Sequence, residues 1–269
     1  MIFVKGYGQM CNNILQYAHI YAWGRENHIK VVSMRFAYKY QYFKLCGYWY
    51  HNWLTYLFAK LLVSLRLIKH LWLEQPEEIT PEAIESLKHD KLIAISGWSF
   101  RFPELFFKYE SKIRDMFAFK GKVKKPVDAF FQACEPHDIR LAVHIRRGDY
   151  ARFQGGIFFY DDNVYIRLIN EFIALHPGKK ISVFICTNDK MLNIALYKQQ
   201  TGVSVHLFRG NEAEDLYLLS QCDYIMGAKS TFSLVAAFYR HVPIYHITDK
   251  DKALAEDSFQ HFEDLFMGV

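Results

Sequence analysis

The sequence predicts an α/β protein with parallel sheets, divided into two domains near residue 125. Three observations support this fold class. Short apolar runs typical of buried strands alternate with helical patterns of about ten to fifteen residues, most regularly in the second half. The length of 269 residues suits two domains of ordinary size. The stretch 121–126, GKVKKP, is typical of a linker, which gives domains of residues 1–125 and 126–269.

The first half begins as a β-α-β unit. Residues 1–4 predict a short buried strand, the glycines at 6 and 8 a turn, residues 12–26 a helix with an apolar stripe, and residues 29–34 a second strand. A helical segment rich in aromatic and basic side chains is expected at 36–75. Further elements are expected as helices at 81–90 and 104–118 and a strand at 92–96.

The second half is more regular. Strands are expected at 139–145, 181–186, 203–208, 223–228 and 242–247, and helices at 161–175, 188–200, 212–221 and 230–240. Asp161 and Asp162 are suited to cap the first of these helices. Strands joined through helices form a parallel sheet with right-handed connections. Ligands bind such sheets at the carboxyl ends of the strands, so functional residues are expected there.

Composition and charge exclude several classes of protein. Apolar residues make up 51% and charged residues 23%, which excludes a disordered chain, a collagen and a coiled coil. Residues 1–73 contain nine Lys and Arg and one acid, Glu26, a charge of +8, which leaves −3 for the rest. Basic and aromatic residues together suit nucleic acid, an anionic membrane or a sugar, or a plain solvated face. Nucleic acid is disfavoured because no nucleic-acid-binding motif occurs.

The segment 45–73 has two interpretations. Its first fifteen residues carry no formal charge, but Lys60, Arg66 and Lys69 follow, so it is too short for a membrane span of about twenty residues. A helix packed in the core is favoured. The alternative is an amphipathic helix at the inner face of the cell membrane. Four apolar side chains at helical spacing fit both interpretations: Trp49, Trp53, Leu57 and Leu61.

Cysteine usage predicts a cytoplasmic protein. The chain has five cysteines, an odd number far below that of a disulfide scaffold, which suits a reducing compartment. No secretory signal follows Met1. Neither CxxC nor HExxH occurs, so no metal site is predicted. The P-loop pattern is absent, and Cys11 stands where a dinucleotide-binding fingerprint starting at Gly6 needs its third glycine.

Two strand ends carry the features of an anion site. Arg146 and Arg147 directly follow the strand 139–145, and the planar guanidinium pairs bidentately with phosphate oxygens. The strand 223–228 leads into a helix start rich in hydroxyl groups, and N–H groups at a helix start bind phosphate. Together the two ends predict a diphosphate site. The residues of the helix start are Ser230, Thr231, Phe232 and Ser233.

Two acidic residues also follow strands. Asp189 comes after the strand 181–186, where it can cap the next helix or accept hydrogen bonds from a ribose or a base. Asp215 lies at the start of a helix, where a carboxylate is favoured by the helix dipole.

Several of these motifs resemble those of a known family. HIRRGDY at 144–150 resembles the HxRRGD signature of GDP-fucose-dependent fucosyltransferases, in particular the bacterial α-1,2-fucosyltransferases of glycosyltransferase family 11. The segment 215–238 and ICTND at 185–189 are similar to two further motifs of that family. The segment 6–22 matches its N-terminal motif only in part, since the first glycine pair is missing. The residues assigned to that motif are Gly8, Gln9, Asn12 and Asn13.

The resemblance implies two Rossmann-like domains arranged as in glycosyltransferase-B enzymes. It implies inverting transfer of L-fucose from GDP-β-L-fucose to a hydroxyl group of a galactoside-type glycan, in α-1,2 linkage, without metal or cofactor. The acceptor would be an oligosaccharide or a lipid-linked glycan. Another GDP-sugar or linkage, or a non-catalytic module that binds a GDP-sugar, remains an alternative.

The resemblance also implies roles for individual residues. Arg146 would hold the diphosphate, His144 would lie near the nucleotide, and Asp215 would bind the guanine. The residues 230–233 would hold the diphosphate and nucleotide. Arg147 and Asp189 are expected on the donor side, although Arg147 could equally pair with Asp149. The resemblance does not assign the base for the acceptor hydroxyl. The chemistry asks for a carboxylate or a histidine, and Asp149 is one candidate.

Overall fold

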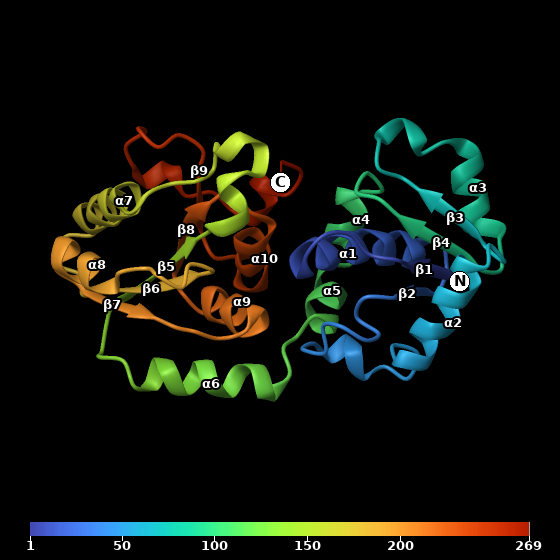
Figure 1. The fold of residues 1–269 in the computed structure, drawn as a ribbon, viewed down its shortest axis with the longest axis horizontal. Helices are drawn as coiled ribbons and strands as arrows, with labels where there is room; N and C mark the ends of the chain where they lie inside the picture. Colours follow the sequence, from blue (N-terminus) through green and yellow to red (C-terminus); the bar gives the residue numbers. More distant parts are fainter. Residues whose placement is uncertain (269) are drawn as a thin grey trace. The chain divides into compact units, whose positions relative to one another are not determined.

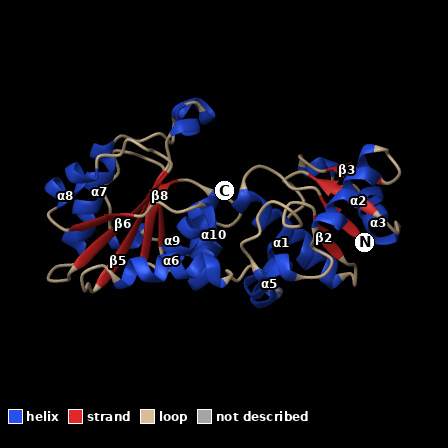
Figure 2. Ribbon diagram, turned by 60° about the horizontal axis from the view of Figure 1, so that its bottom comes forward, coloured by secondary structure: helices blue, strands red, loops and turns tan. Residues whose placement is uncertain are grey.

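The protein is described by a computed structural model that covers residues 1–268, apart from the side chains of residues 149, 153 and 154. The chain forms two compact units, residues 1–121 and 122–269. Each contains a parallel sheet flanked by helices (Figures 1 and 2). Among the described residues, no helix combines the length and apolar character needed to cross a bilayer.

The sheet of the first unit has the strand order β2-β1-β4-β3, with every pair parallel. Its strands are β1 (Ile2–Val4), β2 (Val31–Ser33), β3 (Lys69–Trp72) and β4 (Ile93–Ser96). The predicted β-α-β start is confirmed, because α1 (Met10–Glu26) connects β1 to β2. The other helices are α2 (Trp53–Ser64), α3 (Pro81–His89), α4 (Pro103–Lys108) and α5 (Glu110–Met116).

The segment 36–75 is not one helical segment, as predicted, but turns, α2 and the edge strand β3. The prediction missed β3 because its sequence, KHLW, has no apolar alternation and only one neighbouring strand to pair with. The expected helix 104–118 divides into α4 and α5 at Tyr109. The favoured interpretation of 45–73 as a core helix is wrong. All twelve residues of α2 are described, and Ala59 alone is buried.

The sheet of the second unit has the order β7-β6-β5-β8-β9, again all parallel. Its strands are β5 (Ile139–Ile145), β6 (Ile181–Thr187), β7 (Ser204–Leu207), β8 (Tyr224–Ala228) and β9 (Ile244–Ile247). All five predicted strands are confirmed. The helices are α6 (Gly121–Gln132), α7 (Asp162–Leu175), α8 (Ile194–Thr201), α9 (Glu212–Ser220), α10 (Thr231–Arg240) and α11 (Phe262–Leu265).

The expected linker at 121–126 is the first half of the helix α6, which contains Pro126. Glycine, lysines and proline suggested a loop, but Val123 and Val127, one helical turn apart, are both buried. Their burial stabilises a helix that local propensity disfavours. The division between the two units, at 121/122, falls at the start of α6, whereas the predicted boundary of 125/126 lies inside it.

Strand order in the second unit reverses between β5 and β8. From β5 the chain proceeds outward through β6 and β7, then returns to the other side of β5 to form β8 and β9. Parallel sheets bind ligands at the carboxyl edge where the order reverses. Successive side chains of β5 point to opposite faces of the sheet. Leu141, Val143 and Ile145 belong to the core under α7, whereas the ring of His144 packs against Phe232 of α10.

Close approach of β8 to β5 depends on Gly227. A Cβ atom at this position would lie 2.3 Å from the carbonyl oxygen of His144 and 3.0 Å from its Cβ. A backbone atom of a paired strand cannot move away without loss of the pairing. Glycine is therefore required at the centre of the sheet edge where the strand order reverses.

We expect Gly227→Ala to lower the free energy of unfolding by about 1–3 kcal/mol, the usual cost of overpacking. Gly121→Ala is the matched control, since its added methyl group meets no atom within 4 Å. Urea unfolding of both variants measures the difference. Equal stability of the two variants would contradict the requirement.

Candidate active site

The predicted site residues after β5, β6 and β8 lie at one edge of the second sheet (Figure 1). Ile145 at the end of β5 is in register with Thr187 of β6, and His144 is in register with Gly227 of β8. The segments that leave these strands are therefore neighbours. This arrangement brings the arginine pair close to the start of α10.

Arg146 is held over an aromatic ring that connects two of these segments. Its guanidinium carbon lies 5.2 Å from the centroid of the Tyr150 ring, and the Tyr150 hydroxyl donates to the carbonyl of Lys229 at 2.9 Å. Lys229 directly precedes Ser230, the N-cap of α10, so Tyr150 ties the segment after β5 to the start of this helix. Sequence reasoning did not single out Tyr150, although it closes the HIRRGDY signature.

Arg147 is bound by two carboxylates. Its guanidinium donates to Asp189 at 2.8 Å and also to Asp162, which accepts a further hydrogen bond from Tyr197 at 2.7 Å. The backbone of Arg147 exchanges two hydrogen bonds with the Asn188 side chain, at 2.7 and 2.8 Å. Arg147 and Asp189, both expected on the donor side, are thus brought together, but they form an ion pair with each other. Asp162, expected only as a helix cap, is part of this network.

The carboxylate of Asp189 is stabilised in its charged form. The backbone N–H of Met191 donates to it, and the Arg147 guanidinium adds a second contribution, so that the pKa of Asp189 is lowered. The expected alternative partner of Arg147 was Asp149, whose side chain lies outside the described part of the chain. Its role as acceptor base stays a prediction.

His144 is a buried, neutral histidine. Its ring centroid lies 5.0 Å from that of Phe232, with an angle of 34° between the planes. Burial, followed by the charge of Arg146 and that of His246, lowers the pKa of His144 to about 3. Its Nδ1 atom is buried without a hydrogen-bond partner among the described residues. His144 can therefore offer a hydrogen bond to a ligand but no positive charge near neutral pH.

Hydroxyl groups at the start of α10 shape the turn. Ser230 is the N-cap, and its hydroxyl accepts from the backbone N–H of Phe232 at 3.1 Å. The buried Ser233 hydroxyl donates to the Ser230 carbonyl at 3.1 Å and lies 3.0 Å from Nε2 of His246. These contacts fix the orientation of the first turn, which includes Thr231. Backbone N–H groups of a first helical turn are suited to an anion.

Asp215, in α9, holds a carboxylate oxygen that lacks a partner. The nearby Gly210 backbone N–H lowers the pKa of this carboxyl only in part, and Oδ1 is buried without a hydrogen-bond partner among the described residues. Burial raises the pKa of Asp215 to about 7, and the nearby charges of Glu214 and Glu212 add to the effect. Buried polar atoms normally have partners. A ligand N–H group would supply one.

The N-terminal motif forms the loop between β1 and α1 in the first unit. The buried Asn13 side chain donates to the carbonyls of Tyr7 at 2.9 Å and Gln9 at 2.6 Å, and accepts from the Tyr7 N–H at 3.0 Å. Gly8 has a φ of +56°, which favours glycine. Gly8 and Gln9 are exposed, and Asn12 is partly exposed. Asn13 therefore shapes this loop, while Gly8, Gln9 and Asn12 are accessible.

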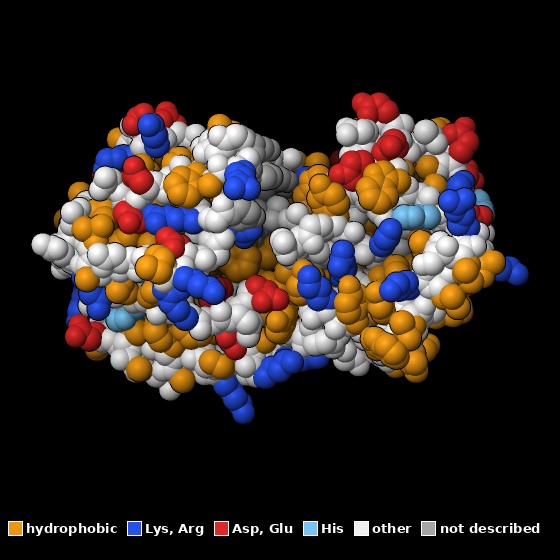
Figure 3. Space-filling model, in the orientation of Figure 1, with side chains coloured by type: hydrophobic (Ala, Val, Ile, Leu, Met, Phe, Trp, Pro, Cys, Tyr) orange, Lys and Arg blue, Asp and Glu red, His pale blue; other side chains and the backbone are white. Residues whose placement is uncertain are grey.

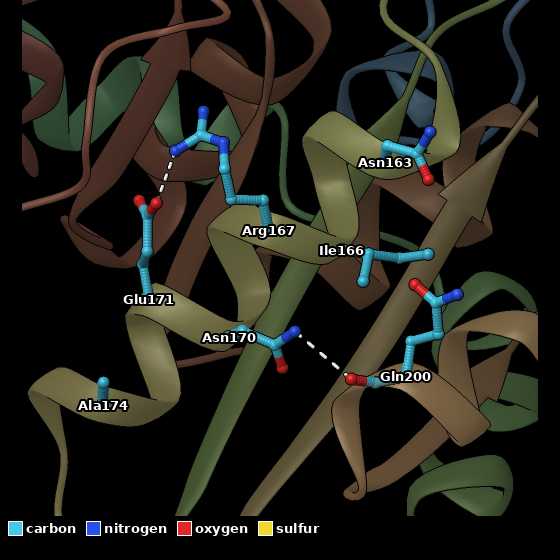
Figure 4. A pocket seen from close by; sticks show the side chains of 7 residues that line it. All are labelled: Asn163, Ile166, Arg167, Asn170, Glu171, Ala174 and Gln200. Atoms are coloured by element: carbon cyan, nitrogen blue, oxygen red, sulfur yellow. Dashed lines mark hydrogen bonds and ion pairs between the residues drawn. The ribbon is translucent and has the colours of Figure 1, made fainter.

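A hollow of about 520 Å³ lies elsewhere in the second unit, on α7 and α8 (Figure 4). Its two charged side chains have structural partners. Arg167 pairs with Glu171 and donates to the Lys250 carbonyl, and Glu171 accepts from the N–H of Leu254 at 2.8 Å. They hold the segment that follows β9, so this hollow is not assigned a ligand. The residues that line it are Asn163, Ile166, Arg167, Asn170, Glu171, Ala174 and Gln200.

Comparison with known proteins identifies the class and then the family. The two parallel α/β units match glycosyltransferases of the GT-B-like fold, as predicted. The model of the family described as "Glycosyl transferase family 11" matches residues 78–263, so the chain belongs to that family. The predicted resemblance to GDP-fucose-dependent fucosyltransferases of this family is confirmed. No curated protein sequence matches the chain.

Three solved structures illustrate the fold. A point mutant of Arabidopsis thaliana FUT1 in complex with GDP has a TM-score of 0.60 at 12% identity, over 97% of this chain and 73% of that one. The fucosyltransferase NodZ from Bradyrhizobium has 0.59 at 12%, over 94% and 97%. POFUT1 in complex with GDP-fucose has 0.55 at 12%, over 89% and 93%.

The raised pKa of Asp215 predicts a dependence of stability on pH. An unfolded Asp loses its proton near pH 4, whereas folded Asp215 keeps it up to about pH 7. Between these values the native state binds more protons than the unfolded state, so stability falls as pH rises. Asp215→Asn removes the titrating carboxyl group and with it this dependence on pH. From pH 5 to pH 8, we expect the free energy of unfolding of the variant to rise by about 2–4 kcal/mol relative to that of the unsubstituted protein.

Urea unfolding at pH 5 and pH 8 tests this expectation. Asp257→Asn, which changes an exposed carboxylate in the same unit, is the matched control. The same pH dependence in the Asp215 variant and in the unsubstituted protein would contradict it.

Proposed function

We propose that the chain transfers L-fucose from GDP-β-L-fucose to a hydroxyl group of a galactoside-type glycan, with inversion and in α-1,2 linkage. One observation carries the proposal. Arg146, the first turn of α10 and the unpartnered oxygen of Asp215 all belong to segments at the carboxyl edge of one parallel sheet. Membership of family 11 supports it, as do solved structures of similar fold that contain GDP or GDP-fucose.

The arrangement suits a nucleoside diphosphate whose base carries N–H donors. Guanine presents two adjacent N–H groups, and the Asp215 carboxylate can accept from them. The diphosphate would lie between the fork of Arg146 and the N–H groups at the start of α10. His144 and Phe232, which pack together, would lie beside the nucleotide. Asp215 must be ionised to accept both hydrogen bonds, so binding of guanine would favour loss of its proton.

Transfer of the sugar leaves negative charge on the departing GDP. Preorganised donors aimed at this charge lower the barrier without further reorganisation. We assign this task to Arg146 and the α10 first turn, and we propose that no metal ion or other cofactor takes part. Arg147 would act as a positioning residue, because its ion pairs with Asp162 and Asp189 fix the segment from which Arg146 projects.

The acceptor side of the reaction needs a base and a surface that binds the glycan. Inversion requires removal of a proton from the acceptor hydroxyl, and we propose Asp149 as the base. The acceptor is an oligosaccharide or a lipid-linked glycan, bound with help from the accessible residues Gly8, Gln9 and Asn12. The reaction takes place in the cytoplasm, a compartment that suits five cysteines that form no disulfide within the described part of the chain.

A GDP-release assay tests the proposed reaction. We expect GDP release that depends on a galactoside-ended glycan with GDP-fucose and not with GDP-mannose. Methylation analysis of the product should place fucose on the 2-hydroxyl of galactose. Release of GDP with GDP-mannose alone would assign another donor. Fucose at a different position of the product would assign another linkage. GDP binding without transfer to any glycan of a broad galactoside panel would favour a binding module, and lack of GDP binding would reject the proposed site.

The two adjacent arginines should differ when each is changed to lysine. Arg146→Lys keeps the charge but loses the planar fork, so we expect turnover to fall by about 100-fold with a small loss of stability. Arg147→Lys cannot span two carboxylates in the same way. We expect this variant to lose about 1.5–3 kcal/mol of unfolding free energy, the usual range for hydrogen bonds to charged groups. Near-normal turnover of Arg146→Lys would remove its assigned role.

A further inference from the structure

The helix α2 has apolar side chains on both of its faces. Ala59, Leu62 and Val63 lie toward the first sheet and pack in a cluster with Phe3 and Val32. The opposite face is exposed, and its apolar side chains keep between 37% and 72% of their surface in contact with solvent. On a helix with 3.6 residues per turn they form one continuous stripe. The stripe consists of Trp53, Leu54, Leu57, Phe58, Leu61 and, directly after α2, Leu65.

The exposed surface continues at both ends of α2. Trp49, 79% exposed, accepts a hydrogen bond through its carbonyl from the N-cap residue Asn52. Leu67, 65% exposed, donates through its backbone N–H to the carbonyl of Leu62 at 2.9 Å. Figure 3 shows apolar side chains gathered over α2 and the segment before it. Contiguous apolar surfaces of this kind mark interaction sites. We call the stripe together with Trp49 and Leu67 the α2 surface.

Cations flank the α2 surface. Lys60 lies on α2 and Arg66 just after it, and both are exposed. The ammonium group of Lys30 lies 4.4 Å from the centroid of Trp49 and 4.2 Å from that of Tyr50. Lys60 and Arg66 lack acidic neighbours in the sequence, and the one acid close to Lys30 is paired elsewhere. Glu26, the one acid of residues 1–73, forms an ion pair with Lys108 at 2.7 Å.

Apolar side chains bordered by Trp, Tyr, Lys and Arg are typical of helices that lie in a membrane interface. The twelve residues of α2 are about 18 Å long, shorter than a bilayer core of about 30 Å. The helix would therefore lie along the surface. We propose that the α2 surface docks on a lipid bilayer that contains anionic headgroups, with the stripe inserted among the lipids and Lys30, Lys60 and Arg66 at the headgroups.

The charges favour a bilayer over a second copy of the chain. Association of two copies through the α2 surface would bring the same cations toward each other, and like charges across an interface are unfavourable. An anionic bilayer presents the opposite charge. Docking is also independent of the proposed transferase activity, because it needs neither donor nor acceptor. If the chain both docks on a bilayer and transfers fucose, it would work at a surface that can carry lipid-linked glycans.

Flotation with vesicles tests the proposal with the full chain and no substrate present. We expect binding to phosphatidylcholine vesicles that contain about one third phosphatidylglycerol, and binding at least about tenfold weaker to phosphatidylcholine alone. Leu54→Gln with Leu61→Gln should reduce binding to the anionic vesicles by about tenfold or more. Met191→Gln, at an exposed apolar side chain of the second unit, is the matched control and should bind as the unsubstituted protein does.

A second pair of variants tests the contribution of charge. Lys30→Gln with Lys60→Gln should weaken binding to anionic vesicles by about tenfold, whereas Lys179→Gln with Lys252→Gln, both in the second unit, should not. Lack of binding at low salt would overturn the proposal, and so would binding that both α2-surface variants retain. Self-association in sedimentation, abolished by the Leu54 and Leu61 changes and without vesicle binding, would assign the surface to a second copy instead. GDP binding, measured in parallel, separates a failure of docking from a failure of the donor site.

Discussion

The candidate site depends on the parallel pairing of β5 with β6 on one side and β8 on the other. This pairing sets three strand ends at one edge, since Ile145 is opposite Thr187 and His144 is opposite Gly227. The order of the strands reverses between β5 and β8, which opens this edge to a ligand. Residues separated by more than eighty positions become neighbours through backbone hydrogen bonds alone. The absence of a side chain at Gly227 permits the close approach.

Two adjacent arginines at this edge have different surroundings. Arg147 is bound between Asp162 and Asp189, carboxylates that come from the helix after β5 and the loop after β6. Arg146 lies over the ring of Tyr150, which itself is fixed to the segment before α10. The ion pairs of Arg147 join three segments of the protein, whereas the aromatic contact of Arg146 sets its guanidinium beside the segment that leads into α10. The geometry therefore distinguishes two residues that the sequence presents as equivalent.

Much of the second unit could be predicted from the sequence. The strand β5 has the predicted bounds because its apolar run ends abruptly at a pair of arginines. Edge strand β3 was missed because half-exposed KHLW has no apolar alternation, and α6 was missed because burial of Val123 and Val127 outweighs an unfavourable proline. Partners such as Asp162 for Arg147 could not be predicted, because they come from separate segments that only the folded sheet brings together.

The exposed stripe of α2 and its cations contribute differently to binding a surface. Burial of one large apolar side chain contributes roughly 1.5–3 kcal/mol, so six side chains, each partly exposed, offer on the order of 5 kcal/mol or more. A lysine or arginine at an anionic surface contributes about 1 kcal/mol. In the proposed docking, the apolar stripe would thus supply most of the binding free energy, while the three cations would decide which surface is bound. Apolar side chains that stay in water add nothing to the stability of the fold. Their burial against an apolar partner would be favourable.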